Sequence, residues 1–291
     1  MMSKMNRRDF IKSIGAAGLF IAFNRVASGY QNIGGPFLRK TVGVKYKDPV
    51  HGANFGMMID VGACIGCRRC EHACRLENNI PDAPSNMHWI DVYEMENSTS
   101  VTAVESIPPI GAVIDYTESP KEDHWYLSFN CFHCENPPCT RVCPTGATYK
   151  DEDGLVLINY DICIGCRYCM AACPYNARRF NWWEPQHPPS RTSPIDGSEV
   201  LLNEEVPLRP RGVTEKCTFC VHRVRDGLKP KCVEVCPVSA RHFGDFNDPT
   251  SEVSRLLATE RTIRIRENLG TQPKLYYFTR GVKWNEEGDK L

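Results

Sequence analysis

The sequence predicts an α+β, loop-rich fold in which one cysteine-rich unit is inserted into another. All 16 cysteines fall into four tight groups. Short strand-like stretches, FGMMID, HWYLSF and LVLINY, precede the first three groups. Residues 151–154 have turn chemistry, which predicts a hairpin joining the second group to the third. In chain order the groups are Cys64, Cys67, Cys70 and Cys74 (group one); Cys131, Cys134, Cys139 and Cys143 (group two); Cys163, Cys166, Cys169 and Cys173 (group three); and Cys217, Cys220, Cys232 and Cys236 (group four).

Length and composition favour a globular protein. The chain has 291 residues, of which 42% are hydrophobic, enough for one large or two modest packed units. Its 35 basic residues balance its 35 acidic residues, and no basic block interleaves with aromatic residues. A nucleic-acid partner is therefore not expected.

The first residues form a distinct segment, 1–28. Arg7 and Arg8 precede an apolar stretch over 14–23 that is too short to span a bilayer comfortably. This order predicts a twin-arginine export signal, and an ordinary basic start to the domain is the alternative. Because this route carries proteins already folded around their cofactors, we expect a periplasmic location or one at the outer face of the cytoplasmic membrane. No later stretch reaches the roughly 20 apolar residues of a spanning helix, so membrane contact is expected through a partner.

The remaining chain divides by its cysteine content. Residues 85–123 lack cysteine and 184–210 are rich in proline, and both read as surface straps that meet partners or as plain loop padding. The tail holds one expected helix, TSEVSRLLATE. The predicted segments are 29–54, an N-terminal extension; 55–84 with 211–248, the outer unit; 85–123, an insertion; 124–183, the inner unit; 184–210, a linker; and 249–291, a C-terminal strap.

The spacing of the cysteines selects the metal chemistry. Disulfide scaffolds spread their cysteines, and structural zinc draws two ligands from each of two separate knuckles. The run CxxCxxCxxxCP is instead the bacterial ferredoxin spacing for [4Fe-4S] clusters, and group three matches it through Cys173 and Pro174. Groups two and four also end in proline. Group one ends Cys74-Arg75, a departure for which the sequence offers no reason.

Connectivity predicts the ligand sets. The hairpin makes groups two and three an inner two-cluster unit, which leaves groups one and four to form an outer unit. In the ferredoxin spacing the fourth cysteine ligates the neighbouring cluster. Each set is named here after the group that supplies three of its cysteines. The sets are Cys64, Cys67, Cys70 and Cys236 (group-one set); Cys131, Cys134, Cys139 and Cys173 (group-two set); Cys163, Cys166, Cys169 and Cys143 (group-three set); and Cys217, Cys220, Cys232 and Cys74 (group-four set).

Four complete sets predict four [4Fe-4S] clusters, with all the iron held by the sixteen cysteines. Complete sets leave no iron open to a substrate, and the CxxCH, GxxxxGK and GxGxxG motifs are absent. We therefore expect electron relay and no catalytic residue. Two alternatives remain, a free cytosolic polyferredoxin and a zinc-stabilised interaction module.

Other side chains near the cysteines have two interpretations each. His133 and His222 are expected to pack or to donate hydrogen bonds rather than to bind metal. Trp182 and Trp183 are expected to cover apolar surface rather than to gate electron flow. Ten basic residues either form a solvated face or offset the negative charge of the clusters and raise their potentials. They are Arg68, Arg69, Arg167, Arg178, Arg179, Lys216, Arg223, Arg225, Lys229 and Lys231.

The chain resembles the four-cluster iron–sulfur subunits of the dimethyl sulfoxide, polysulfide, tetrathionate and formate-dependent nitrite reductase systems. CFHCENPPCTRVCPTGA, CIGCRYCMAACPYNARRF and CTFCVHRVRDGLKPKCVEVCP carry the resemblance, which covers about residues 55–248. It implies an electron relay between an integral membrane, quinone-interacting subunit of the polysulfide-reductase type and a multihaem cytochrome c or a molybdopterin catalytic subunit. The chain's own export signal favours the periplasmic iron–sulfur subunit of the membrane complex linked to dissimilatory sulfite reductase. A molybdopterin or formate-dependent nitrite reductase complex is the alternative.

Overall fold

Short strands and helices lie next to each cysteine group in the computed structural model, which describes residues 46–81, 87–96 and 118–280. The predicted signal, 1–28, lies outside these ranges. The strands are β1 (Phe55–Asp60), β2 (Asp91–Glu96), β3 (His124–Phe129), β4 (Thr148–Lys150), β5 (Val156–Ile158), β6 (Arg179–Phe180), β7 (Ser190–Thr192), β8 (Glu199–Leu201), β9 (Thr214–Glu215), β10 (Arg241–Asp245), β11 (Thr262–Ile263) and β12 (Leu275–Phe278). The helices are α3 (Arg69–Glu77), α4 (Pro138–Arg141), α5 (Tyr168–Ala171), α6 (Val221–Val224), α7 (Lys231–Glu234) and α8 (Glu252–Thr259), with 3₁₀ turns η2 (Tyr160–Ile162) and η3 (Glu267–Leu269).

The predicted local elements are confirmed. Strand β1 covers FGMMID, β3 covers HWYLSF and β5 lies within LVLINY. Strands β4 and β5 pair antiparallel, as expected of a hairpin between groups two and three. Helix α8 lies within TSEVSRLLATE and buries Val253. The α+β, loop-rich class is therefore correct.

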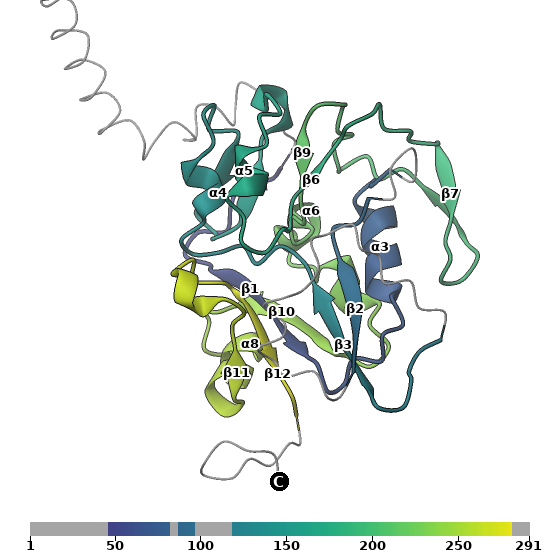
Figure 1. Cartoon of the computed structure of the whole chain (residues 1–291), viewed down its shortest axis with the longest axis vertical. Helices are drawn as coiled ribbons and strands as arrows, with labels where there is room; N and C mark the ends of the chain where they lie inside the picture. Colours follow the sequence, from purple (N-terminus) through teal and green to yellow (C-terminus); the bar gives the residue numbers. More distant parts are fainter. Residues whose placement is uncertain (1–45, 82–86, 97–117, 281–291) are drawn as a thin grey trace, which may run out of the picture. The chain divides into compact units, whose positions relative to one another are not determined.

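The largest sheet joins segments that are far apart in the sequence. Its order is β10-β1-β12-β11 (Figure 1). Strand β1, which precedes group one, pairs antiparallel with β10, which follows group four. Strand β12 pairs parallel with β1, with Ile59 opposite Tyr277. The expectation that 249–291 is only a surface strap is therefore wrong for β12, because Leu275 and Tyr277 are buried in the core.

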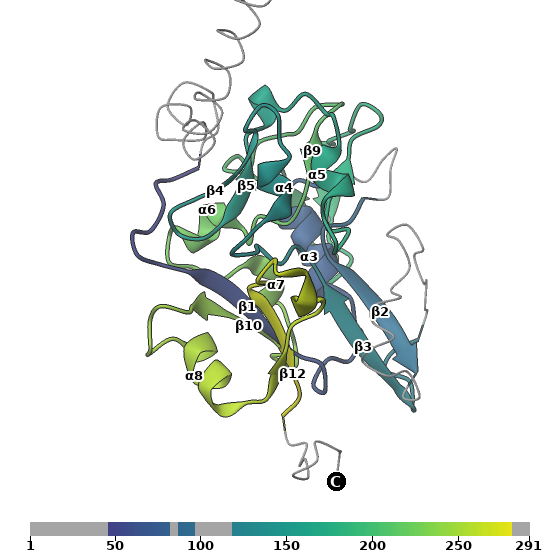
Figure 2. The ribbon, with the colours of Figure 1, turned by 60° about the vertical axis from the view of Figure 1, so that its left-hand side comes forward.

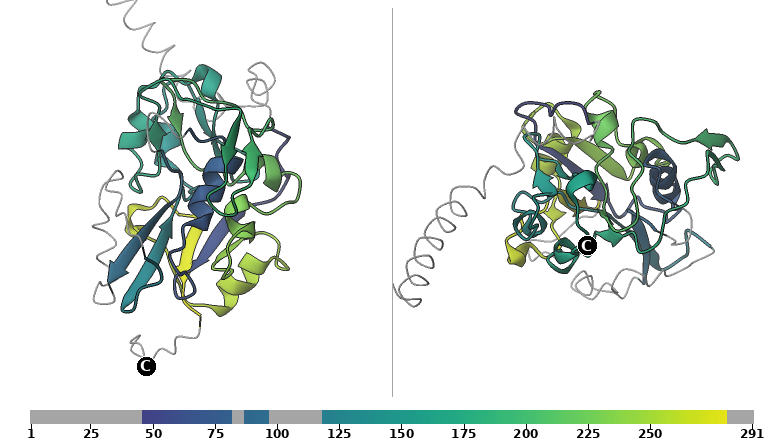
Figure 3. Two further views of the ribbon diagram at one scale, coloured as in Figure 1. Left: turned by 90° about the vertical axis from the view of Figure 1, so that its right-hand side faces the viewer. Right: turned by 90° about the horizontal axis from the view of Figure 1, so that it is seen from above.

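A second correction concerns the cysteine-free segment 85–123. Its strand β2 pairs antiparallel with β3 along their whole lengths and forms a two-stranded ribbon beside the main sheet (Figure 3). Trp89, Ile90 and Val92 are buried. This part of the segment belongs to the core, because Val92 and Tyr93 of β2 are buried and β2 pairs with the strand that leads into group two.

The proline-rich segment 184–210 also differs from an extended linker. It contains the antiparallel pair β7–β8. Arg191 donates to the carbonyl oxygens of Ile80 at 2.7 Å and of Arg75 and Leu76 at 3.3 Å. These carbonyls lie in the last turn of α3 and just beyond its end, where the helix dipole favours a cation. The segment therefore closes the end of the group-one helix.

The helices pair in a way that joins the groups. Helix α3 of group one packs against α7 of group four, and α4 of group two packs against α5 of group three. Figures 1 and 2 show α4 and α5 together at one end of the described fold, and α8 with the main sheet at the other. The chain from residue 44 onward forms one compact unit. No helix in the described ranges is long and apolar enough to cross a membrane.

Candidate metal centres

The first CxxC pair of each group forms a loop that contains left-handed backbone. The residue before the second cysteine has φ of +70° at Gly66, +43° at His133, +67° at Gly165 and +55° at Phe219. This conformation turns the chain back on itself, and glycine adopts it at little cost. Groups one and three use glycine, whereas groups two and four hold a histidine and a phenylalanine in the same strained conformation.

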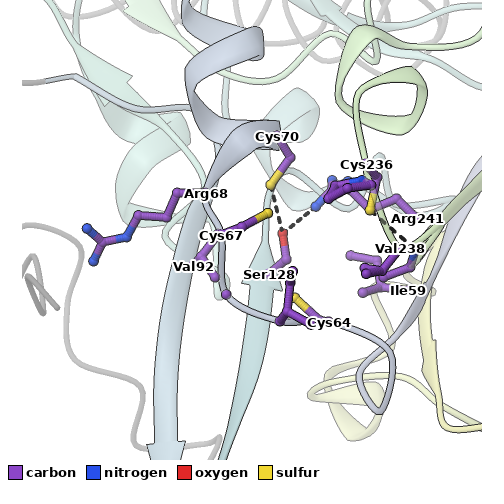
Figure 4. A pocket seen from close by; sticks show the side chains of 14 residues that line it. Ile59, Cys64, Cys67, Arg68, Cys70, Val92, Ser128, Cys236, Val238 and Arg241 are labelled. Atoms are coloured by element: carbon purple, nitrogen blue, oxygen red, sulfur yellow. Dashed lines mark hydrogen bonds between the residues drawn. The ribbon is translucent and has the colours of Figure 1, made fainter. Parts of the chain in front are cut away.

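The group-one set surrounds one pocket. Cys64, Cys67, Cys70 and Cys236 line it together, and Figure 4 shows their sulfur atoms around a common space while Arg68 extends away. Burial raises the pKa of Cys64, with Cys236 and Cys67 adding to the rise. Burial also raises the pKa of Cys70 to about 12. The structure thus brings the last cysteine of group four to the first three of group one.

The cysteines of the group-four set also lie together. Burial raises the pKa of Cys74 well above its usual value, and the thiols of Cys217, Cys220 and Cys232 add to the rise. All four side chains are buried. The amide of Asn78 donates to Cys74 Sγ at 3.6 Å and to Cys220 Sγ at 3.5 Å. Sequence reasoning missed Asn78, since it lies 142 positions from Cys220 in the sequence and only the folded chain brings the two together.

The group-two set shows the same convergence. Burial raises the pKa of Cys134, and the neighbouring thiols of Cys131, Cys139 and Cys173 add to it. Burial raises the pKa of Cys173 to about 11, while a backbone N–H of Ala177 opposes the rise. The last cysteine of group three therefore lies among the first three of group two.

The group-three set is linked through helix packing. Helix α5, which carries Cys169, packs against α4, and Cys143 comes just after the C-cap residue of α4. The backbone N–H of Thr148 donates to Cys143 Sγ at 3.4 Å. Burial alone would raise the pKa of Cys143, but hydrogen bonds from Thr148 and Thr145 lower it. A thiolate at Cys143 is therefore stabilised by donors already in place.

These donor sets fit [4Fe-4S] clusters. All sixteen cysteines are free despite their proximity. Backbone N–H groups point at further sulfurs, from Phe219 to Cys217 at 3.4 Å and from Ala240 to Cys236 at 3.3 Å. Across the described residues, no three histidine, cysteine, aspartate or glutamate side chains come close enough to share one metal ion. A cubane makes a different demand, because each of its irons takes one thiolate at a separate corner.

A junction connects group two to group four. His133 and Phe219, the two strained residues, stack with ring centroids 3.9 Å apart. His133 Nε2 donates to the carbonyl of Cys217 at 2.9 Å, and its Nδ1 accepts from the N–H of Val156 at 3.0 Å. Burial holds the pKa of His133 well below its usual value, so the ring stays neutral. Asn130 donates to Cys217 Sγ at 4.0 Å and to the carbonyl of Cys131 at 2.9 Å.

The histidines near the cysteines lie as expected, whereas the two tryptophans do not. His222 contacts Glu77 Oε1 at 2.8 Å, so both histidines pack and form hydrogen bonds, as expected. Trp182 packs edge-on against Phe180, but it and Trp183 remain 49% and 57% exposed and cover little.

The flanking cations do not form a single face. Arg178 and Lys216 are buried, whereas Arg69, Arg167 and Lys229 are exposed. Sequence reasoning missed Arg241, which is buried and lines the group-one pocket. The sequence does contain a pattern that could have identified Arg241, because it follows a Cys-Pro pair at the same spacing as Arg178 does.

Comparison with known proteins agrees with this chemistry. Three families described as 4Fe-4S dicluster domains match residues 122–187, 155–237 and 63–147. The chain is 45% identical over 226 residues to a protein of Halobacterium salinarum that is provisionally named as a dimethyl sulfoxide reductase iron–sulfur subunit, covering 77% of this chain and 78% of the relative. It is 39% identical over 251 residues to the menaquinone reductase iron–sulfur cluster-binding subunit of Nitratidesulfovibrio vulgaris, covering 78% and 89%. It is also 39% identical over 228 residues to one of the polysulfide reductase chains of Wolinella succinogenes, covering 76% and 92%.

The identity spans most of each relative, and the three domain matches together include every cysteine group. The convergent thiols provide sites for [4Fe-4S] clusters, which serve electron transfer. The protein therefore belongs to the family of [4Fe-4S] iron–sulfur subunits that transfer electrons in respiratory reductase complexes such as those of dimethyl sulfoxide and polysulfide reductase.

Proposed function

We propose that this chain relays electrons through four [4Fe-4S] clusters between a quinone-interacting membrane subunit and a redox partner protein. The observation that carries the proposal is the pocket in which Cys236 meets Cys64, Cys67 and Cys70. Cys236 is remote in sequence from the other three cysteines of this pocket. In the ferredoxin spacing, the last cysteine of one group ligates the cluster of another group, and Cys236 has this position. The relative named as a menaquinone reductase subunit supports the quinone link.

The ligands are the four sets defined above, arranged in two nested units. The β1–β10 pair and the packing of α3 on α7 support an outer unit. The β4–β5 hairpin and the packing of α4 on α5 support an inner unit within it. When bound, the clusters supply one-electron redox chemistry.

The chain's own residues set the order of the sites. The thiol of Cys131 lies close enough to that of Cys217 to raise its pKa, after the larger effects of burial and Cys232. Asn130 bridges the same two groups. These contacts support the order group-one, group-four, group-two, group-three, with the group-four and group-two sets in the middle.

Burial differs between the middle and the ends of this order. Every cysteine of the group-four set is buried, whereas Cys67 of the group-one set is exposed. At the other end, Ile164 and Tyr168 of group three are 66% and 64% exposed. We assign electron exchange with the two partners to these two ends, while the middle excludes water.

The complex we favour is the membrane complex linked to dissimilatory sulfite reductase, at the outer face of the cytoplasmic membrane, with a multihaem cytochrome c as redox partner. The relatives named after dimethyl sulfoxide and polysulfide reductases favour a second candidate, a complex with a molybdopterin catalytic subunit. Purification of the complex from its native membrane, followed by haem and molybdenum assays, distinguishes the two candidates.

The export proposal has a separate test. The double variant Arg7→Lys with Arg8→Lys should leave the protein in the cytoplasm with its iron intact. Undiminished export of this double variant would contradict the signal.

Iron analysis tests the cluster count. We expect roughly sixteen irons and sixteen acid-labile sulfides per chain. Stoichiometric zinc without labile sulfide would contradict the proposal.

The crossing assignment has its own test. Cys173→Ala should perturb the group-two cluster and spare the group-three cluster, as read by electron paramagnetic resonance. Cys74→Ala should perturb the group-four cluster in the same way. Each variant must remain folded with three unperturbed centres, because cluster loss can also unfold a unit. If Cys173→Ala instead perturbed the group-three cluster and Cys74→Ala the group-one cluster, the nested units would be ruled out.

A further inference from the structure

Two arginines are buried with no carboxylate partner in the described part of the chain. Arg178 is 2% exposed and Arg241 is 3% exposed. Among the described residues, neither forms an ion pair with aspartate or glutamate. The chain does pair other buried arginines, since Arg209 meets Glu215 at 3.2 Å. An isolated buried cation is costly, so these two guanidinium groups require another source of negative charge.

The two arginines occupy equivalent positions. Arg178 is the fifth residue after Cys173, and Arg241 is the fifth after Cys236, counting from 173 to 178 and from 236 to 241. A proline follows each of these cysteines directly. One arginine therefore belongs to the inner unit and the other to the outer unit, at the same step of the repeated motif.

Arg241 lies between the two cysteine sets of the outer unit. It lines the pocket of the group-one set and donates to Ser128 Oγ, which lies 3.9 Å from Cys70 Sγ (Figure 4). It also donates to Asn130 Oδ1 at 2.6 Å. Burial would lower the pKa of Arg241, but the thiolates of Cys232, Cys70 and Cys217 raise it. These three cysteines come from both sets of the outer unit.

Arg178 has the matching place in the inner unit. It donates to Thr148 Oγ1 at 3.1 Å, and the backbone N–H of Thr148 donates to Cys143 Sγ. Its Nη2 is buried and has no hydrogen-bond partner among the described residues. Burial would lower its pKa, but four nearby thiolates raise it. They are Cys139, Cys169, Cys131 and Cys173, again drawn from both sets of the unit.

We propose that Arg178 and Arg241 are the internal counter-cations of the inner and outer units, and that each raises the reduction potentials of the two clusters in its own unit. The proposal rests on the four ligand sets of the proposed function. One-electron reduction adds one negative charge to a cluster that its four thiolates already make anionic, and the electron comes from the partner protein. A fixed guanidinium in a low-dielectric interior stabilises that added charge without gaining or losing a proton. Arginine is suited to this role because it stays charged when buried.

Redox titration of the full-length protein tests the proposal. Arg241→Gln should shift the midpoint potentials of both outer-unit clusters to more negative values and leave those of the inner unit unchanged. Arg178→Gln should do the reverse. The lysine variants at both positions keep the charge and should stay close to wild type. Electron paramagnetic resonance follows the centres, which Cys74→Ala and Cys173→Ala assign to their units.

The matched control is Arg209→Gln. It removes an equally buried guanidinium, but one that Glu215 already neutralises. We expect this variant to lose stability while all four potentials stay unchanged. An equal shift in this control would show that loss of any buried arginine moves the potentials, which would overturn the specific role.

The redox titrations distinguish failure of this inference from failure of the proposed function. Four clusters with wild-type potentials in both glutamine variants would overturn the inference and leave the proposed function standing. Fewer than four clusters in the wild-type protein would instead refute the proposed function. If Arg241→Gln does not assemble, Asn130→Asp gives Arg241 an isosteric carboxylate partner and cancels its charge in place. Unchanged outer-unit potentials in that variant would equally overturn the inference.

Discussion

The group-four and group-one sets, which we assign to one outer unit, differ greatly in their exposure to water. Cys74, Cys217, Cys220 and Cys232 are only 4–5% exposed, and the helices that carry Cys74 and Cys232, α3 and α7, pack against each other. In the group-one set Cys67 is exposed and its loop opens at the surface. The comparison shows that one motif, placed in two surroundings, produces a shielded centre and an accessible one. An electron relay needs both kinds of centre. Electrostatic interactions are stronger at the shielded centre, where water is excluded, and redox partners can approach the accessible centre at the surface.

The largest expected effect comes from removing one thiolate from each of these sets. Cys220→Ala should lose roughly a quarter of the iron and lower the thermal midpoint strongly, since metal binding in a buried site contributes directly to folding. Cys67→Ala should lose a similar share of iron with a smaller fall in the midpoint, because its site borders solvent. Iron analysis and thermal unfolding check both variants. Equal midpoints would mean that the difference in burial has no energetic consequence.

A second prediction concerns the contact between Arg225, at the C-terminal end of α6, and the β4–β5 turn. Arg225 pairs with Asp151 and Asp153 at 2.8 Å, and both carboxylate side chains are 0% exposed. Arg225→Met should destabilise the protein by about 3–5 kcal/mol, because it leaves two buried charges next to the β4–β5 turn. Denaturant unfolding measures this loss. The control Lys121→Met breaks the more exposed pair with Glu94 and should destabilise the protein far less, because water screens that pair.

A third prediction sharpens the difference between the CxxC loops. Gly66 has φ +70°, and an added Cβ would lie 2.4 Å from the ring of Tyr126. Gly66→Ala should therefore cost roughly 2–5 kcal/mol, from backbone strain together with overpacking. Gly227 has φ +74° and nothing within 4 Å, so Gly227→Ala should cost only about 1–2 kcal/mol. Similar losses in the two variants would show that Tyr126 does not constrain the group-one loop.

The smallest expected effect lies at the contact between α8 and β10. Glu252 Oε1 contacts His242 Nδ1 at 2.7 Å. Burial raises the pKa of Glu252, but the hydrogen bond and charge of His242 lower it below its ordinary 4.5 overall. A lowered carboxyl pKa contributes stability above pH 4.5 that disappears as the pH falls through the folded-state pKa.

Glu252→Gln should therefore cost less than about 1 kcal/mol at pH 6, with a difference from wild type that shrinks in acid. Denaturant unfolding at pH 6 and pH 4 measures it. The exposed β8 variant Glu199→Gln serves as the control and should leave the pH profile unchanged. A difference that grows in acid would contradict the assigned direction.

Prediction from sequence succeeded where the signal is local. The strands before groups one to three, the β4–β5 hairpin and helix α8 depend on neighbouring residues and turn chemistry. It failed where a contact spans the chain. Asn78 reaches Cys220 across 142 positions, and no local pattern marks an asparagine for that role. Strand β12 was read as part of a strap because its partner β1 lies more than 200 residues earlier.

The sequence by itself determined the ligand types, their spacing and the closed hairpin between groups two and three, since these depend on covalent distance along the chain. Only the tertiary structure decided which thiols are shielded, which glycine meets an aromatic ring and which arginines have no carboxylate partner among the residues that the structure describes. Burial and charge pairing are properties of the folded surroundings. The CxxC motif therefore has a different electrostatic environment in each cysteine group. Segments that are remote in the sequence determine its exposure to water and the number of opposite charges near it.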